Sequence, residues 1–454
     1  MTSKRPSLTG EQVALSEARK AKKAKQNVAA PTTASLVDEV KGRIIDRKWI
    51  QIKDADNIPS GHRVKILTWN LLAQCLVKRE LFPNSDCLKA VQREHMVYRE
   101  MLQHNADILC LQEVDRLEKL LPVLENAGYA HRYAAGPNKK HGCLIAFKKD
   151  LYEEMGLKLI LYDQENVRDT DEEGVSLYGS TFRTRNIGHI VALKHTQCDE
   201  GLVIATTHLF WHPKYVYEKA RQAAILKREV VRFKQSIGHD DWPCIISGDF
   251  NFTPDDPVYS LIVGDPVLPV QEKKLRPSYV IHTTIDPVVA TGASGTTDGN
   301  NENEQEGADP DQVITNARAA RPVDGLLSLS ELKNLFLSSG PPLKSAYDSS
   351  LRGYLESFSE SNKPTRTFGD RVSIPSSRLG GYEPEWTSYT YYWKLVLDYI
   401  FILDAPQSQS TITGVLSGHR TEDLQLGLPQ LGVCGSDHVL LSAEIVFAPT
   451  STSA

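Results

Sequence analysis

Short apolar runs rich in β-branched residues recur along the chain from about residue 62, and stretches with helical periodicity lie between them. The apolar runs predict strands at residues 64–70, 107–114, 142–149, 188–195, 202–210, 243–251, 395–403 and 439–447. Residues 214–237 carry an apolar stripe at spacings of three and four, and residues 116–128 end at a glycine, so both predict helices. Apolar strands that alternate with amphipathic helices are typical of an α/β fold in which helices cover the sheets.

Two stretches lack this pattern. Residues 1–45 carry basic clusters and predict a disordered tail, which is either a solvated segment or a nuclear-localisation or RNA-steering element. Residues from about 287 to 320 are rich in Gly, Asn, Asp and Glu and nearly free of aromatic side chains. Strand-like runs resume after them, so they predict an acidic disordered insertion within one domain, residues 62–448, which a short tail at 449–454 follows.

Composition narrows the class of protein. Of the 454 residues, 41% are hydrophobic and 24% are charged, as is typical of a globular chain. No apolar stretch is long enough to cross a membrane, and the first residues lack the apolar core of a secretory signal. Seven scattered cysteines are typical of reduced thiols. We therefore expect an intracellular protein of the cytoplasm or nucleus, because the acids near the N-terminus argue against a mitochondrial leader.

Several predicted strands end in, or lead from, polar residues that a strand does not require. These residues are Asn70, Glu113, His208, Asp249 with Asn251, Asp398, and Asp437 with His438. Each one alone has an ordinary explanation, as a helix cap, a turn former or a paired buried acid. Together, four acids embedded in apolar runs require cations, because a buried unpaired carboxylate is costly and few lysines or arginines lie nearby in sequence.

A set of oxygen ligands without cysteine selects a hard cation, Mg²⁺ or Mn²⁺ as its substitute. Cations held in this way normally act on phosphates, and they let a chain with a net charge of −5 bind them. His438 beside Asp437 adds an imidazole for proton transfer. Asp249 and Asn251 are two positions apart, so an extended segment would turn both to one side, with Phe250 and Phe252 on the other.

The motifs of the chain, taken in order, resemble the endonuclease/exonuclease/phosphatase superfamily. They read TWNLLAQ, LCLQEV, HGCLIAF, RTRNIGHIVAL, TTHLFWHP, SGDFNFTP, LDYIF and GSDH. The resemblance runs from about residue 62 to 448. It is strongest to the branch of the carbon-catabolite-repressor deadenylases, nocturnin, Angel proteins and, above all, the fungal Ngl-type RNA exonucleases. It implies a DNase I-like four-layer α/β sandwich, two packed mixed β-sheets flanked by helices, with the active site where strand ends converge.

The resemblance also implies roles for the polar residues. Glu113 would be the principal Mg²⁺ ligand with Asn70 beside it, and Asp437 would complete the metal site. Asp249 would activate or position the attacking water, and Asn251 would bind the scissile phosphate.

On the other side of the reacting phosphate, His438 would stabilise the charge of the transition state or act as a base, and the buried Asp398 would orient it. Asn186 and His208 match phosphate-contacting positions of the family.

Two further positions match residues that sandwich the 3′-terminal base in deadenylases, namely Pro213 and Trp393. Deadenylases carry Phe where this chain has Trp393 and Asn where it has Ser388, so the resemblance leaves adenine preference open. Stacking on an aromatic side chain suits single-stranded RNA.

The activity implied is that of a Mg²⁺-dependent 3′→5′ exoribonuclease that releases 5′-mononucleotides from single-stranded RNA 3′ ends. Targets would be poly(A) tails or the 3′ extensions of ribosomal RNA precursors. The chain has no leucine-rich repeats, the module by which one deadenylase subunit docks into its complex. Two alternatives remain open: a nocturnin-like phosphatase acting on NADPH, and an RNA-binding scaffold with an inactive centre. A closed pocket rich in Lys and Arg would favour the phosphatase, and an open groove would favour RNA.

Overall fold

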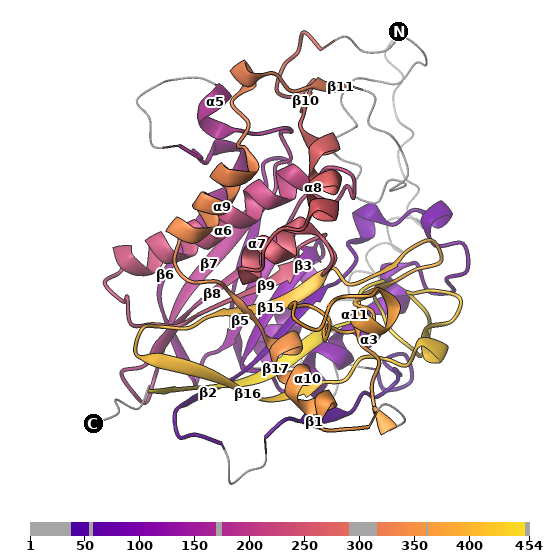
Figure 1. The fold of residues 1–454 in the computed structure, drawn as a ribbon. Coiled ribbons are helices and arrows are strands. Elements are labelled where there is room, and N and C mark those ends of the chain that lie inside the picture. Colours follow the sequence, from indigo (N-terminus) through magenta and orange to yellow (C-terminus); the bar gives the residue numbers. More distant parts are fainter. Residues whose placement is uncertain (1–37, 54–57, 169–174, 290–315, 360–361, 450–454) are drawn as a thin grey trace, which may run out of the picture.

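A computed structural model describes residues 38–53, 58–168, 175–289, 316–359 and 362–449 (Figure 1). Most of the predicted basic tail (1–45), most of the acidic insertion (287–320) and nearly all of the tail at 449–454 therefore lie outside the described residues. Among the described residues, no helix combines the length and apolarity that crossing a bilayer requires.

Two mixed sheets form the centre of the described structure. The first sheet runs in the order β1 (Trp49–Gln51), β16 (Ser408–Leu416), β17 (Leu441–Pro449), β2 (His62–Asn70), β3 (Ile108–Val114), β5 (Gly142–Lys148) and β4 (Tyr129–Ala135). The second sheet runs in the order β12 (Lys344–Ser345), β15 (Asp398–Leu403), β9 (Cys244–Asp249), β8 (Gly201–His208), β7 (Ile187–His195) and β6 (Tyr152–Leu161). Within the two sheets as described, β2 with β3 and β8 with β9 are the parallel pairs, and the other neighbours are antiparallel.

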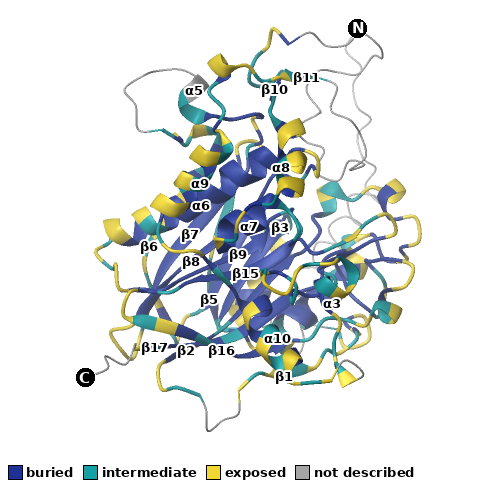
Figure 2. Ribbon diagram, viewed as in Figure 1, coloured by how far each residue is buried: buried dark blue, intermediate teal, exposed yellow. Residues whose placement is uncertain are grey.

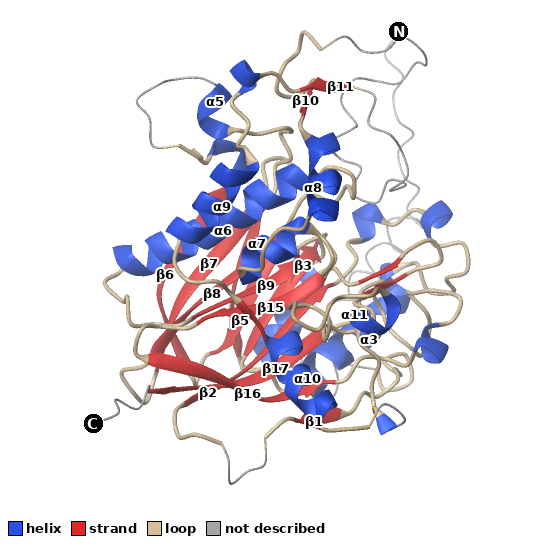
Figure 3. Cartoon of the chain, viewed as in Figure 1, coloured by secondary structure: helices blue, strands red, loops and turns tan. Residues whose placement is uncertain are grey.

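Helices cover the outer face of each sheet (Figure 3). Against the first sheet lie α3 (Ala90–Gln103) and α4 (Leu117–Asn126), and against the second lie α6 (Val216–Ser236), α7 (Pro257–Val263), α8 (Pro269–Leu275) and α9 (Leu329–Ser338). Shorter elements are α5 (Val175–Tyr178), α10 (Ala346–Glu356), α11 (Phe368–Arg371) and the hairpins β10 (Val280–His282) with β11 (Ala317–Ala319) and β13 (Ser388–Tyr389) with β14 (Lys394–Leu395).

The central strands, such as β8 and β9, are buried along their whole length and appear dark blue in Figure 2. Along β8, Leu202 and Ile204 pack in the core between the sheets, and Val203 and Ala205 pack against the helices of the second sheet. Burial on both faces explains why such strands appear in the sequence as continuous apolar runs. The predicted four-layer α/β sandwich is confirmed.

All eight predicted strand regions form strands, and the helix predicted at 214–237 is α6. In the two main sheets as described, the strands β1, β4, β6, β12 and β16 were not predicted, because they contain charged, hydroxyl or exposed positions.

The folded domain also begins earlier than the predicted boundary at residue 62, since β1 pairs with β16 and the buried Arg47 forms an ion pair with Glu100 at 2.8 Å. Residues 317–319, inside the predicted insertion, pair with β10.

Candidate active site

The ends of parallel strands bring four of the predicted site residues to one edge of the two sheets. In the first sheet, β2 and β3 run parallel, so Asn70 at the end of β2 lies beside the end of β3 that carries Glu113. In the second sheet, β8 and β9 run parallel, and His208 lies directly beside Asp249. The carboxyl ends of parallel strands share one edge of a sheet, which is where sites form in α/β folds.

Two antiparallel strands bring the remaining acids to the same edge. The first residue of β15, Asp398, pairs with Asp249, the last residue of β9. The strand β17 runs antiparallel to β2, so the loop that precedes β17 delivers Asp437 and His438 to the end of β2. Asn186 precedes β7, whose first residues pair with the end of β8.

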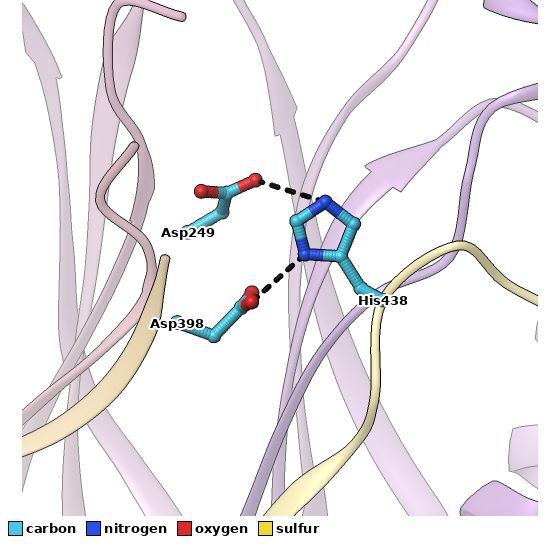
Figure 4. Close-up of side chains that lie close together, drawn as sticks. All are labelled: Asp249, Asp398 and His438. Carbon is cyan, nitrogen blue, oxygen red and sulfur yellow. Dashed lines mark hydrogen bonds and ion pairs between the residues drawn. The ribbon is translucent and has the colours of Figure 1, made fainter. Parts of the chain in front are cut away.

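At the centre of the edge, His438 lies between two buried carboxylates (Figure 4). Its Nδ1 is 2.8 Å from Asp398 Oδ2, and its Nε2 is 3.7 Å from Asp249 Oδ2. Burial lowers the pKa of His438, but the charges of Asp398 and Asp249 outweigh it and hold that pKa well above its ordinary value. The two acids therefore favour the cationic form of the imidazole, which Asp398 orients and which is directed at Asp249.

The amide of Asn70 links Asp249 to one more carboxylate, that of Glu113. Asn70 Nδ2 donates to Glu113 Oε1 at 2.9 Å and to Asp249 Oδ2 at 3.0 Å. The backbone N–H of Ala73 donates to Glu113 Oε2 at 2.8 Å. His208 Nε2 lies 3.5 Å from Asp249 Oδ2, and its Nδ1 lies 3.9 Å from Glu113 Oε1. Asn70 and His208 thus join the Glu113 and Asp249 carboxylates into one connected group.

Glu113 is held in a backbone conformation that side chains rarely adopt, with a φ of 54°. A non-glycine residue in the left-handed region costs about 1–3 kcal/mol, and such strain concentrates at functional sites. It turns the Glu113 carboxylate out of β3 toward Asn70 and the Ala73 amide.

Burial opposes the ionisation of two acids of the site. Burial raises the pKa of Asp249 to about 6, and burial also raises the pKa of Asp437. The nearby Arg93 guanidinium donates to the carbonyls of Leu71, Leu72 and Gly435, so its hydrogen bonds go to the backbone. Buried carboxylate and amide oxygens that repel one another fit a hard divalent cation.

Among the described residues, potential ligand atoms of Asp249, Asp398 and His438 all lie within 4.8 Å of one another. Asp398 Oδ2 and His438 Nδ1 are already hydrogen-bonded to each other, so we interpret this trio as an oriented imidazole. The predicted metal residues Glu113, Asn70 and Asp437 lie on the first-sheet side of the same edge, and their role stays a prediction.

The structure corrects the expected conformation of Asn251. Asp249 and Asn251 do not face the same way in an extended segment, because β9 ends at Asp249 and Asn251 has a φ of 53°. The Asn251 N–H donates to Asp249 Oδ1 at 3.0 Å, and its Nδ2 donates to the Leu209 carbonyl at 3.1 Å. Phe250 and Phe252 are both buried and contact each other, with ring centroids 5.5 Å apart.

Two hydroxyl groups position the central residues, although neither was singled out as a site residue. Thr387 Oγ1 accepts hydrogen bonds from the N–H groups of Leu397 at 2.8 Å and Asp398 at 3.0 Å. Ser436 Oγ donates to the Asn70 carbonyl at 2.6 Å and accepts from the His438 N–H at 3.2 Å. The GSDH motif contained a signal for Ser436, whereas Thr387 acts through a tertiary contact that no motif shows.

A hollow beside the centre is lined on one side by basic residues that the sequence analysis did not identify. Its lining includes Glu113, Lys139, His141, Arg185, Asn186 and His208. Lys139 Nζ donates to Asn186 Oδ1 at 3.2 Å, and Asn186 Nδ2 donates to the His208 carbonyl at 2.6 Å. The lysines of NKKHGC, just before β5, were the available signal. The hollow therefore brings the basic side chains of Lys139 and Arg185 close to Glu113.

The two residues expected to sandwich a base lie on different sides of the centre. Trp393 is half-buried and packs with Phe82 in a cluster that includes Leu72, close to Asn70. Pro213 is exposed in the segment after β8, on the side of His208. Ser388 is fully buried, and its backbone forms a β-bridge with His438. Whether Trp393 and Pro213 hold one base between them stays a prediction.

Comparison with known proteins gives the same fold and branch. The RNA exonuclease NGL2 of Saccharomyces cerevisiae is 31% identical over 249 residues, which cover 49% of this chain and 46% of that protein. A Schizosaccharomyces pombe protein named "Probable RNA exonuclease C9B6.11c" is 26% identical over 447 residues, which cover 93% of this chain and 84% of that protein.

Among solved structures, ANGEL2, a 2′,3′-cyclic phosphatase, has a TM-score of 0.56 at 20% identity, covering 88% of this chain and 99% of that one. The human nocturnin catalytic domain has a TM-score of 0.50 at 18% identity, covering 89% and 97%. The family model described as "Endonuclease/Exonuclease/phosphatase family" matches residues 67–444. With that match over most of its length, the chain belongs to the endonuclease/exonuclease/phosphatase family.

Proposed function

We propose that this protein is a Mg²⁺-dependent 3′→5′ exoribonuclease that hydrolyses the terminal phosphodiester bond of RNA and releases 5′-mononucleotides. The observation that carries the proposal is the buried His438, held between Asp398 and Asp249 and facing the linked Glu113 and Asn70. The RNA exonuclease names of two relatives support RNA as the substrate. Poly(A) tails and the 3′ ends of ribosomal RNA precursors are the expected targets.

In this mechanism, the residues of the chain divide the tasks. The Asp249 carboxylate accepts a hydrogen bond from the attacking water, which orients it, and then takes its proton as the water attacks. Its pKa near 6 leaves the carboxylate ionised at neutral pH. The cationic His438 stabilises the charge that develops on the phosphoryl oxygens. The amides of Asn186 and Asn251 each use one N–H for a backbone carbonyl, and each has a second N–H for the phosphate.

Glu113, Asn70 and Asp437 would hold the divalent cation, which when bound would neutralise the phosphate oxygens and stabilise the leaving group. Asn70 Nδ2 already donates to Glu113 and Asp249, so its Oδ1 is the atom that can act as a ligand. That oxygen also accepts the Leu72 N–H at 3.0 Å, which fixes its direction.

The test uses purified protein with 5′-labelled oligo(A), oligo(U) and a mixed-sequence RNA, with Mg²⁺ or with EDTA. We expect a ladder that shortens from the 3′ end with Mg²⁺, and none with EDTA or in the Asp249→Ala and His438→Ala variants. A matched control is Leu337→Ala, an exposed position on α9. RNA that stays intact with the wild-type protein and Mg²⁺ would contradict the proposal, and binding without cleavage would instead indicate a scaffold with an inactive centre.

A second candidate function is removal of a phosphate from a small nucleotide such as NADPH. The hollow lined by Lys139, His141 and Arg185 beside Glu113 supports it, because cationic side chains there suit a compact phosphate group. Phosphate release from NADPH with no RNA shortening would favour this function. Arg185→Ala should then raise KM for NADPH more than it raises KM for RNA.

A further inference from the structure

The hairpin of β13 and β14 presents aromatic rings to solvent at its tip. Tyr391 is 55% exposed and Tyr392 is 60% exposed, whereas Trp393 is half-buried. The rings of Tyr391 and Tyr392 have centroids 5.0 Å apart at 88°, and those of Tyr392 and Trp393 have centroids 6.5 Å apart at 24°. Three consecutive aromatic side chains thus lead outward from the partly buried tryptophan to two exposed tyrosines.

Hydrogen bonds hold the backbone of the tip in place. Thr390 Oγ1 accepts hydrogen bonds from the N–H groups of Tyr392 at 3.2 Å and Trp393 at 3.0 Å. The Thr390 N–H donates to the Trp393 carbonyl at 2.8 Å, and Trp393 packs edge-on against Phe82 at 6.4 Å. A tyrosine on a fixed backbone loses only the freedom of two side-chain torsions when it binds a flat ligand, so the cost in conformational entropy is low.

Backbone contacts fix this tip to the candidate active site. The Tyr389 N–H donates to the Asp437 carbonyl at 3.0 Å, and Ser388 forms a β-bridge with His438. Tyr391 follows Ser388 by three residues, so their Cα atoms are at most about 11 Å apart. The exposed rings therefore stand at the rim of the site, a short distance from the histidine at its centre.

The surroundings of the rings are apolar and basic. Leu426, 65% exposed, precedes Gly427, whose position lies against the backbone of Thr390 and Tyr391. The exposed Lys394 follows Trp393, and its ammonium lies 5.0 Å from the centroid of the Tyr389 ring. Aromatic faces interleaved with a basic side chain are the combination that binds unpaired nucleic acid.

We propose that Tyr391 and Tyr392 form a stacking platform for the unpaired nucleotides that lie on the 5′ side of the nucleotide being removed. The inference rests on the proposed exoribonuclease function and specifies its substrate, a single-stranded 3′ end several nucleotides long. A partner protein is the less favoured occupant, because the rings sit at the rim of the candidate active site beside the basic Lys394, which suits a nucleic-acid backbone. A small nucleotide confined to the centre would not reach them.

The test compares the double variant Tyr391→Ala/Tyr392→Ala with wild type on a long oligonucleotide and on a dinucleotide. Base stacking on an aromatic ring is worth about 1–3 kcal/mol by alanine substitution, so we expect KM for the long RNA to rise at least about tenfold. We expect kcat, and the kcat/KM of the dinucleotide, to stay unchanged. The variant Tyr391→Phe/Tyr392→Phe should retain the wild-type KM, and Leu337→Ala on α9 serves as a control.

The outcomes separate this inference from the proposed function. If wild type cleaves no RNA, both the proposed function and the platform are wrong. If wild type cleaves RNA and the alanine variant has an unchanged KM for the long substrate, only the platform is wrong. An equal loss of kcat/KM for the long RNA and the dinucleotide would also overturn the platform, since the hairpin would then act by supporting His438. A change in the binding of another protein, with RNA cleavage unaltered, would overturn it as well.

Discussion

Asp249→Asn should make the metal-free protein more stable while abolishing its activity. In the folded chain, burial and the neighbouring Asp398 raise the pKa of Asp249 from 3.8 to about 6. A raised carboxyl pKa means that the folded state binds the proton more tightly than the unfolded state does. The free energy of unfolding therefore falls as pH rises from about 4 to about 6, and it stays lower at higher pH.

The size of the effect follows from the same difference in pKa. At about 1.4 kcal/mol per pH unit, ionising Asp249 in the fold costs about 3 kcal/mol at pH 7. Asparagine removes the charge, but its NH₂ group can meet the Asn70 NH₂ group, now 3.0 Å from the Asp249 oxygen. We therefore expect a net gain of about 1–2 kcal/mol, or a few degrees in Tm.

The assay is thermal unfolding of wild type and Asp249→Asn in EDTA at pH 4.5 and pH 7.5, with an RNA cleavage assay alongside. The gain should be present at pH 7.5, nearly vanish at pH 4.5, and shrink when Mg²⁺ is added, because the cation offsets the same negative charge. An asparagine variant that is less stable than wild type at pH 7.5 in EDTA would refute the reasoning. So would a gain of equal size at both pH values.

Three more perturbations test the site and the fold. Asp398→Asn should lower kcat about 10- to 100-fold with little change in KM, because His438 loses a charge-assisted hydrogen bond of 2.8 Å; steady-state RNA cleavage measures this. Gly248→Ala should lower both Tm and activity, since Gly248 has a φ of +150° and an added Cβ would lie 2.2 Å from the Thr207 carbonyl oxygen. A Gly248→Ala protein with the wild-type Tm would contradict this prediction. Burial raises the pKa of Glu383 to about 8, so stability should fall as pH rises from about 4.5 to 8, and Glu383→Gln should flatten that part of a Tm–pH curve.

The strands that the sequence predicted are those that are buried on both faces. β8 and β9 are apolar throughout, so they stand out in the sequence without knowledge of their neighbours. β6 alternates exposed with half-buried positions at the edge of its sheet and carries Glu153, Glu154 and Lys158, so its pattern does not separate it from a loop. Strand prediction succeeded where burial was complete and failed where it was partial.

The candidate site was predictable for a related reason. Asp249 and Asp398 are charged residues at the ends of apolar strands, and such residues need an explanation wherever they occur. Thr387 and Lys139 lie outside the strands, and their contacts depend on how distant segments meet. The conformation of Asn251 was mispredicted because its N–H donates to the Asp249 side chain, which ends the strand at Asp249. The two-residue periodicity of a strand does not take such local side-chain hydrogen bonds into account.

The position of β17 between β2 and β16 affects when the candidate active site is assembled during folding. The Trp69 indole donates to the His438 carbonyl across 369 positions of sequence, so the histidine reaches the acids only after the late strand β17 has paired. Pairings of such long sequence separation form slowly. During synthesis, a chain emerging from a ribosome would carry Glu113 and Asp249 without His438, so the proposed activity would be absent until β17 closed the first sheet.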